Sequence, residues 1–309
     1  MSTQRQGLVY GLAAYGLWGL FPLYWPLLRP AGAVEILAHR IVWSLLVVIA
    51  LLAVIALFAV RRASTDLPAL LRQPAALRRL ALAAVVLSAN WGVYIYGVNS
   101  AQVVETSLGY FVNPLVTVVL GVVVLRERLR RPQWTAVGIA ALAVAVLTAD
   151  YGHVPVIALT LAVSFGCYGL LKKQANAGAL EGLTVETSVL FLPALGYLVV
   201  LAARGSSSFG VDLPHDLGHD ALLAGAGVVT AVPLLFFGAA TTRIPLTLIG
   251  LLQYVTPIMQ LAIGVLLRHE PMPPARLAGF ALVWLALAVL TADGLRNHRR
   301  QTRLTAGLV

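Results

Sequence analysis

The sequence predicts an all-α membrane protein with ten transmembrane helices in two inverted five-helix repeats. Three observations lead to this prediction. The chain of 309 residues is 60% hydrophobic and 11% charged, with a mean hydropathy of +0.87, which is too apolar for a soluble protein of this length. One segment recurs at a constant spacing, and basic residues concentrate in alternate loops.

Apolar runs of about 18 to 25 residues recur along the chain, and such runs cross a hydrocarbon core of about 30 Å. Helices are required because an open backbone in lipid leaves its amide groups unpaired. The first run is too long for a cleaved signal peptide, so we expect it to remain as a helix. The ten predicted spans are residues 7–28, 34–59, 80–98, 103–125, 133–149, 154–171, 184–203, 221–242, 245–267 and 274–292.

Residues 108–127 and 251–270 are two long apolar segments 143 residues apart, each with a proline near its middle and an acidic end. Pro114 matches Pro257, Gly121 matches Gly264 and Glu127 matches Glu270. An internal duplication in a membrane chain indicates a transporter built from two halves. Five spans per half is an odd number, so the second half enters the membrane in the opposite orientation. The predicted units are repeats at 1–150 and 151–295, followed by a basic cytoplasmic tail at 296–309.

The net charge of the chain is +10, and its basic residues lie mostly in the loops on one side of the membrane. With the amino terminus inside, the inner loops hold most of the lysine and arginine residues, and the outer loops hold only Arg29, Arg204 and Arg268. The positive-inside rule then places both termini in the cytoplasm and the protein in the cell (inner) membrane. The basic loops face anionic membrane lipid, and we expect no nucleic-acid partner.

No metal or cofactor is expected. The single cysteine, Cys167, excludes an intrachain disulfide and a multi-cysteine metal site. The outer loop from Asp212 to Asp220 places His215 and His219 four residues apart, a spacing that binds metal on a helix. Gly218 weakens such a helix, so a solvated polar loop is favoured.

The paired prolines suggest where a pathway runs. A proline inside a helix leaves the carbonyl four residues back without its amide donor, here those of Tyr110 and Gln253. Freed carbonyls at membrane depth are tolerated where they line a cavity or find a polar neighbour. The alternative is a pair of packing kinks. Polar side chains cluster beside both prolines: Thr106, Ser107, Tyr110 and Asn113 in one segment, and Thr247, Gln253, Tyr254, Thr256 and Gln260 in the other. Of these, Tyr110, Asn113, Gln253 and Tyr254 are the ones expected to contact substrate.

Asn90 and Trp91 place an amide and an aromatic face in the third span, which suits an organic substrate. Interhelical hydrogen bonding and packing would require the same residues. Glu127 and Glu270 end the two duplicated segments, and a local salt bridge that closes each turn is the favoured interpretation.

Ionisable residues inside a span are candidates for function because their burial is costly. Arg40 is expected to pair with an acidic substrate group or with Glu105, and His39 titrates near neutral pH, which suits proton coupling. Glu105, like Glu35 and Glu186, begins a span, where the helix dipole also favours a carboxylate. For Glu35 and Glu186, a structural and a functional role both remain open.

Several segments together resemble the RarD branch of the EamA family, in the drug/metabolite transporter superfamily. They are AAYGLWGLFPLYW, EILAHRIVWS, SANW, ETSLGYFVNPL, LRER and LLQYVTPIMQLAIGVLLRHE, in this order over nearly the whole chain. The resemblance implies ten helices from two inverted repeats around a central cavity. It also implies movement of small metabolites or drugs, usually outward.

The predicted function is therefore a multi-pass transporter of small molecules, working by alternating access as a monomer or homodimer, rather than an enzyme. The alternative is an integral-membrane enzyme that acts on lipid-linked substrates. Such an enzyme would need acids, bases or metal ligands grouped at the membrane interface, and the run near His215 is the nearest match.

Overall fold

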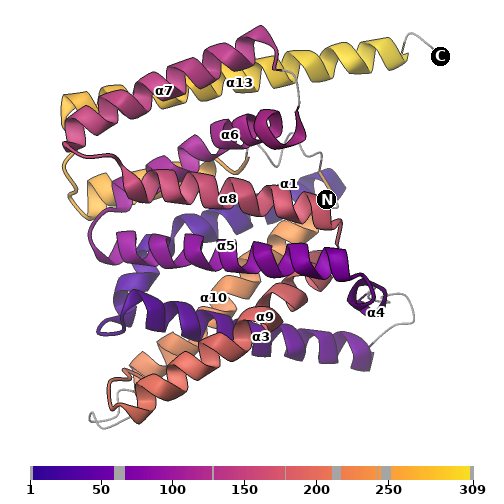
Figure 1. Ribbon diagram of the computed structural model, residues 1–309, viewed down its shortest axis with the longest axis vertical. Coiled ribbons are helices and arrows are strands. Elements are labelled where there is room, and N and C mark those ends of the chain that lie inside the picture. The colour runs from indigo at the N-terminus through magenta and orange to yellow at the C-terminus, as the bar shows by residue number, and fades with distance from the viewer. Residues whose placement is uncertain are drawn as a thin grey trace.

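The computed structural model of the chain describes residues 3–58, 67–126, 129–177, 179–210, 217–241, 243–244 and 252–306. Within these ranges all regular structure is helical (Figure 1), which confirms the predicted all-α class. The elements are α1 (Thr3–Gly19), α2 (Phe21–Tyr24), η1 (Trp25–Leu28), α3 (Ala33–Phe58), α4 (Leu67–Leu71), α5 (Pro74–Asn99), α6 (Val103–Leu125), α7 (Arg131–Tyr151), α8 (Val156–Ala175), α9 (Ala179–Ala203), α10 (Leu217–Thr241), α12 (Val255–Ala262), η2 (Ile263–Leu267) and α13 (Pro274–Ala306).

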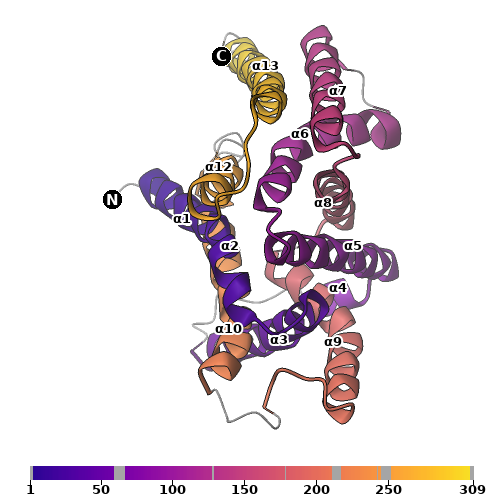
Figure 2. The same cartoon turned by 90° about the vertical axis from the view of Figure 1, so that its left-hand side faces the viewer.

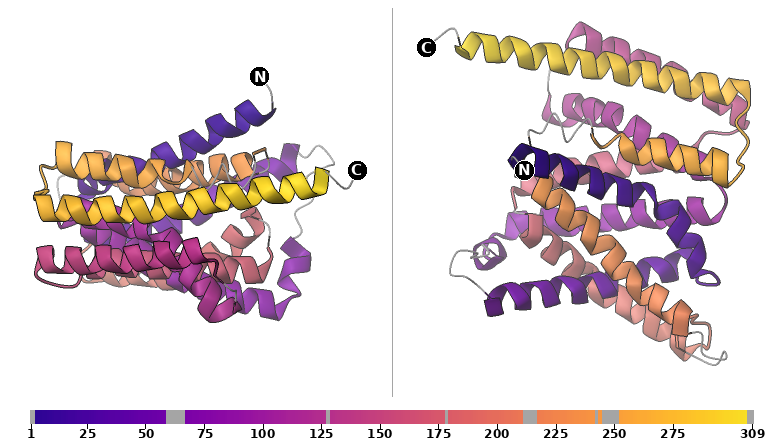
Figure 3. Two further views of the ribbon diagram at one scale, coloured as in Figure 1. Left: turned by 90° about the horizontal axis from the view of Figure 1, so that it is seen from above. Right: turned by 180° about the vertical axis from the view of Figure 1, so that it is seen from behind.

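Eight of the described helices are long and apolar enough to span a membrane, and Val156–Lys172 and Val255–Leu267 are shorter apolar helices. Large apolar side chains face outward, among them Leu192 at 73% and Val123 at 70% exposure, as expected for surfaces that contact lipid. The start of α1 and the end of α13 lie toward the same end of the bundle (Figure 3).

The first predicted span is not one continuous helix. α1 ends at Gly19, where a Cβ would lie 2.8 Å from the Cβ of Met259. Pro22 and Pro26 then occupy the first turns of α2 and η1. Proline suits a first turn, where its missing amide hydrogen has no intrahelical acceptor. The helix is therefore interrupted twice within residues 7–28, at Leu20 and at the start of η1.

The ninth predicted span is interrupted as well. Residues 245–251 lie outside the described residues, and α12 begins only at Val255. Pro257 is therefore in the first turn of a helix rather than near its middle, which corrects the prediction of a mid-helix kink there. Pro114, in contrast, lies inside α6. After α12 the chain widens into the π-helical turn η2.

The helices pack in groups that join distant parts of the chain. α7 lies along α13, while α8 packs against both α5 and α6 (Figure 2). α10 packs against α1 and α3, α9 against α3, and α12 against α1 and α6. Helices from the first and second parts of the sequence therefore alternate throughout the bundle.

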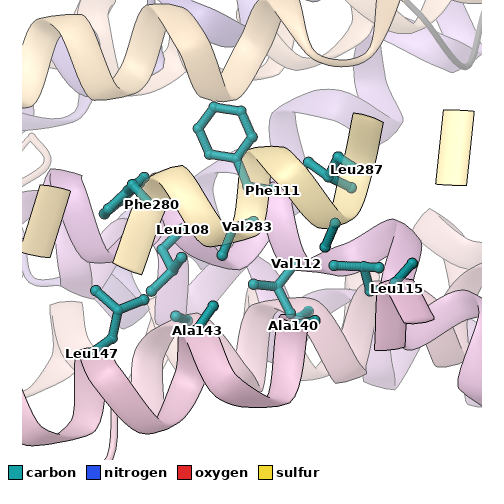
Figure 4. Close-up of a cluster of buried hydrophobic side chains, with 14 of the residues drawn as sticks. Leu108, Phe111, Val112, Leu115, Ala140, Ala143, Leu147, Phe280, Val283 and Leu287 are labelled. Atoms are coloured by element: carbon teal, nitrogen blue, oxygen red, sulfur yellow. The ribbon is translucent and has the colours of Figure 1, made fainter. Parts of the chain in front are cut away.

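One apolar cluster joins α6, α7 and α13 (Figure 4). Leu108 and Phe111 of α6 pack there against Ala143 and Leu147 of α7 and Phe280 of α13. Small residues such as Ala143, which is 0% exposed, allow helices to approach closely in a membrane. The cluster fixes α6, which also contributes to the site described below.

Glu270 stabilises the start of a helix far away in the sequence. Its Oε1 and Oε2 accept hydrogen bonds from the backbone N–H groups of Val103 and Val104, at 2.6 and 2.7 Å. These first-turn amides have no intrahelical acceptor, and the helix dipole favours a carboxylate there. Burial raises the pKa of the Glu270 carboxyl, and these two hydrogen bonds oppose the shift. The predicted local salt bridge is wrong for Glu270, and Glu127 lies outside the described residues.

Candidate functional site

Arg40 lies at the meeting point of several helices. On α3, it is 2% exposed. Its Nε donates a hydrogen bond to Thr230 Oγ1 of α10 at 2.8 Å. The guanidinium carbon lies 3.8 Å from the ring centroid of Trp91 on α5. A desolvated cation–π contact of this kind contributes about 2 kcal/mol, which offsets part of the cost of burying the charge.

Further aromatic rings surround the guanidinium. The rings of Trp25 and Phe21 lie 5.2 and 5.6 Å from its carbon. Tyr110 of α6 packs edge-on against Tyr94 of α5 at 5.6 Å and against Phe165 of α8 at 6.2 Å. Of the predicted site residues, Arg40, Trp91 and Tyr110 therefore belong to one neighbourhood, while Phe21 and Trp25 were not predicted.

Asn90 and Asn113 tie helices together. The Asn90 amide donates to Leu161 O at 3.0 Å and to Ser164 Oγ at 2.9 Å. The Asn113 amide donates to Ala162 O, also at 3.0 Å. These bonds join α5 and α6 to α8, which is the interhelical alternative already considered for Asn90. Both residues thus hold in place the helices that present Trp91 and Tyr110.

Gln260 belongs to the site, although it was not among the predicted site residues. It is 1% exposed, and its amide donates to Tyr94 OH at 2.9 Å and to Trp18 O at 3.3 Å. The bond connects α12 to the aromatic neighbourhood of Arg40. The only signal in the sequence is a long polar side chain in an apolar segment, three residues after Pro257.

His39 is separated from Arg40 although the two are adjacent in sequence. Its Nδ1 accepts a hydrogen bond from Trp43 Nε1 at 3.3 Å, and its ring lies 4.9 Å from that of Phe209. Successive side chains on a helix point about 100° apart, so Arg40 faces Trp91 while His39 faces the segment after α9. The two residues do not form one charged site.

The acids at helix starts have structural partners. Glu105 Oε1 accepts from the N–H groups of Ile157 and Ala158 at 3.0 and 3.4 Å, so it caps α8 rather than pairing with Arg40. This finding overturns the predicted alternative of an Arg40–Glu105 pair.

Glu35 and Glu186, for which two roles stayed open, each have a partner. Glu35 Oε1 accepts from Ser208 N at 2.7 Å. Glu186 Oε1 lies 2.8 Å from Lys172 Nζ. Each of these contacts is consistent with a structural role for the carboxylate.

Gln253 and Tyr254 lie in the turn before α12 and are half-buried. Tyr254 packs against the apolar cluster of α6, α7 and α13, and within the described residues neither residue contacts Arg40. The described part of the chain holds no group of three or more metal-binding side chains. His215 and its neighbours 211–216 lie outside it.

Comparison with known proteins identifies the family. The EamA-like transporter family matches residues 5–149. Protein RarD of Streptomyces exfoliatus is 58% identical over 99% of this chain and 94% of its own length. Protein RarD of Escherichia coli is 38% identical over 97% of this chain and 98% of its own length. The chain belongs to the RarD branch of the EamA family.

Other relatives carry the word transporter in their names. The uncharacterized transporter YojE of Bacillus subtilis is 41% identical over 96% of both chains. One solved structure, 19% identical, has a TM-score of 0.55 and covers 92% of this chain and 96% of its own, so it shares the fold. Together with the apolar helices, these matches make the chain a multi-pass membrane protein of a transporter family.

Proposed function

We propose that this RarD-branch protein carries small molecules across the cell membrane by alternating access. In this proposal ten spans form two inverted halves, and the substrate binds in the neighbourhood of Arg40. The observation that carries the proposal is the convergence on one buried cation of α3 and α5 from the first half and α10 from the second. Buried charge inside a membrane bundle marks functional sites by default.

The packing of the helices supports the inverted repeat. If α1, α3, α5, α6 and α7 correspond in order to α8, α9, α10, α12 and α13, most contacts interchange. The α5–α8 contact matches α10–α1, and α6–α8 matches α12–α1. Exchanging the two halves leaves three contacting pairs unchanged, namely α3–α9, α6–α12 and α7–α13. A two-fold axis between the halves requires such pairs.

The distribution of charge and the positions of the ends support cytoplasmic termini. An even number of spans places both termini on one side, and the ends of α1 and α13 lie toward the same end of the bundle. α4, in the arginine-rich segment after α3, lies at that end as well (Figure 1). The positive-inside rule makes this the cytoplasmic side.

His39 is our candidate for proton coupling. Its Nε2 is buried without a hydrogen-bond partner among the described residues, and a histidine changes charge near neutral pH. In this proposal His39 acts apart from Arg40. No observation favours the alternative of a membrane enzyme.

Flux in proteoliposomes tests the proposal. Purified protein is reconstituted, and uptake of labelled candidate metabolites is followed by counterflow. We expect specific flux that Arg40→Ala and Asn113→Ala lower at least tenfold, since the first removes the buried cation and the second frees α6 from α8. Leu192→Ala, on the exposed surface of α9, is the matched control. Unchanged flux in both site variants refutes the site assignment.

A further inference from the structure

We propose that the Arg40 guanidinium binds the acidic group of the transported molecule, and that the substrates are small organic anions with a carboxylate on an apolar or aromatic body. The inference rests on the proposed transport function and adds the chemical class of substrate. It begins from the charge of Arg40, which no acid among the described residues neutralises.

Every aspartate and glutamate that the structure describes is engaged away from Arg40. Glu35 accepts from Ser208, Glu105 from the first amides of α8, Asp220 from Gly210, and Glu270 from the first amides of α6. Asp150 pairs with Arg276, Glu186 with Lys172 and Asp293 with Arg130, and Glu181 is likewise engaged. Within the described residues, Arg40 therefore has no anionic partner.

Arg276 shows how this protein completes a comparable site. Its guanidinium carbon lies 4.1 Å from the ring centroid of Tyr151, much as Arg40 lies against Trp91. Its Nε is 2.8 Å from the carboxylate of Asp150, and its Nη1 donates to Pro271 O at 2.7 Å. Where Arg276 has an acid, the one hydrogen-bond partner of Arg40 among the described residues is the neutral hydroxyl of Thr230.

The free edge of Arg40 suits a carboxylate. A guanidinium has five N–H donors, and only Nε of Arg40 donates to a described residue. The terminal nitrogens form the fork that accepts a planar oxyanion through two parallel hydrogen bonds. Trp25, whose ring lies 5.2 Å from the guanidinium carbon, has a buried Nε1 without a described partner, so the neighbourhood holds a second unused donor.

The surroundings of the guanidinium favour an apolar or aromatic body. Tyr94 and Tyr110 belong to the same cluster as Phe21 and Trp25, and Phe165 packs against Tyr110. A molecule bound to the guanidinium therefore lies among ring faces and edges, which bind planar apolar groups. Because Arg40 is 2% exposed, entry and release require the helices around it to separate, as alternating access demands.

Matched pairs of probes test the charge requirement. The full-length protein is placed in nanodiscs of phosphatidylcholine and phosphatidylglycerol, and binding is measured by calorimetry and thermal shift. The pairs are benzoate with benzamide and 3-phenylpropionate with 3-phenylpropionamide, which keep the ring and differ in charge at neutral pH. We expect each acid to bind at least tenfold more tightly than its amide. Equal binding, or no binding by either acid, overturns the proposal.

Variants assign the preference to Arg40. Arg40→Met should abolish the difference between acid and amide, while Arg40→Lys, which keeps the charge but loses the fork, should retain a smaller one. Arg276→Met is the control, because it removes a stacked arginine that already has an acid, and it should keep the full preference. A preference that survives Arg40→Met refutes the assignment even if Arg40→Lys fails to fold.

Two further measurements separate the claims. If acetate and inorganic phosphate bind as tightly as benzoate, the apolar body plays no part and that element of the proposal is wrong. Counterflow in proteoliposomes distinguishes this inference from transport itself. If binding depends on Arg40 but no flux is seen, the proposed transport function is wrong and the anion site is supported. If benzoate flux persists in Arg40→Met, transport is supported and the anion site at Arg40 is wrong.

Discussion

Gly227→Ala should destabilise the protein because α10 and α3 are in backbone contact at this residue. A Cβ at Gly227 would lie 2.5 Å from the carbonyl carbon of Trp43 and 2.7 Å from its oxygen. Carbon contacts are comfortable at about 3.5–4.0 Å, and backbone atoms cannot rotate away. The helices must therefore separate by about 1 Å to restore an ordinary contact. Arg40 and Thr230 lie nearly one turn from this contact, and their 2.8 Å bond would then exceed hydrogen-bonding distance.

Three energies decide the size of this effect. Overpacking costs about 1–3 kcal/mol, and losing a hydrogen bond to a charged group costs about 1.5–3 kcal/mol. Alanine recovers about 1 kcal/mol through its higher helix propensity. The net loss is about 1.5–5 kcal/mol, visible as a lower melting temperature in a fixed detergent. Gly138→Ala in α7, where a Cβ meets nothing within 4 Å, is the control. Equal melting temperatures for the two variants would refute the close-contact reasoning.

Three other substitutions test separate contacts. Glu270→Ala should lower stability by about 1–2 kcal/mol, because the first amides of α6 lose their acceptor; hydrogen exchange at those amides reports it, and unchanged exchange contradicts the capping role. Asp150→Asn should lower the free energy of unfolding by about 1.5–3 kcal/mol, because it removes the charge beside Arg276. Thermal unfolding measures this, and an unchanged melting temperature would show that the ion pair does not stabilise the protein. Gln260→Leu should leave Tyr94 OH unsatisfied, at a cost of about 1–3 kcal/mol, and lower flux; wild-type flux and melting would argue against the bond.

The helical architecture could be predicted because membrane helices are encoded by long apolar runs. α5, α6 and α13 lie where the hydropathy places them, although α13 continues as helix to Ala306, into the predicted basic tail. The failures come from local backbone chemistry. Pro22 and Pro26 start new turns, so the first span breaks even though its composition stays apolar. Hydropathy averages over such breaks and cannot locate them.

The site could be predicted only in part. Arg40 was visible because a charge inside a span is rare, and Trp91 because it follows a polar residue in a membrane helix. Phe21 was not predicted, and Gln260 was noted only as a polar side chain near Pro257, since a single aromatic or amide in an apolar span carries no sign of its neighbours. Their roles depend on α2 and α12 meeting the helices around Arg40, which is a property of tertiary packing.

The acids explain why Arg40 stands apart. From sequence, Glu105 was a natural counter-ion, and Glu270 was expected to close its own turn. In the structure Glu270 accepts hydrogen bonds from the first turn of α6 and Glu105 from that of α8. First-turn amides buried between helices are costly when they lack an acceptor. In this protein the two carboxylates bind such amides and not Arg40. The buried Arg40 guanidinium is thereby left without an acidic partner among the described residues, and we propose that a substrate carboxylate supplies one.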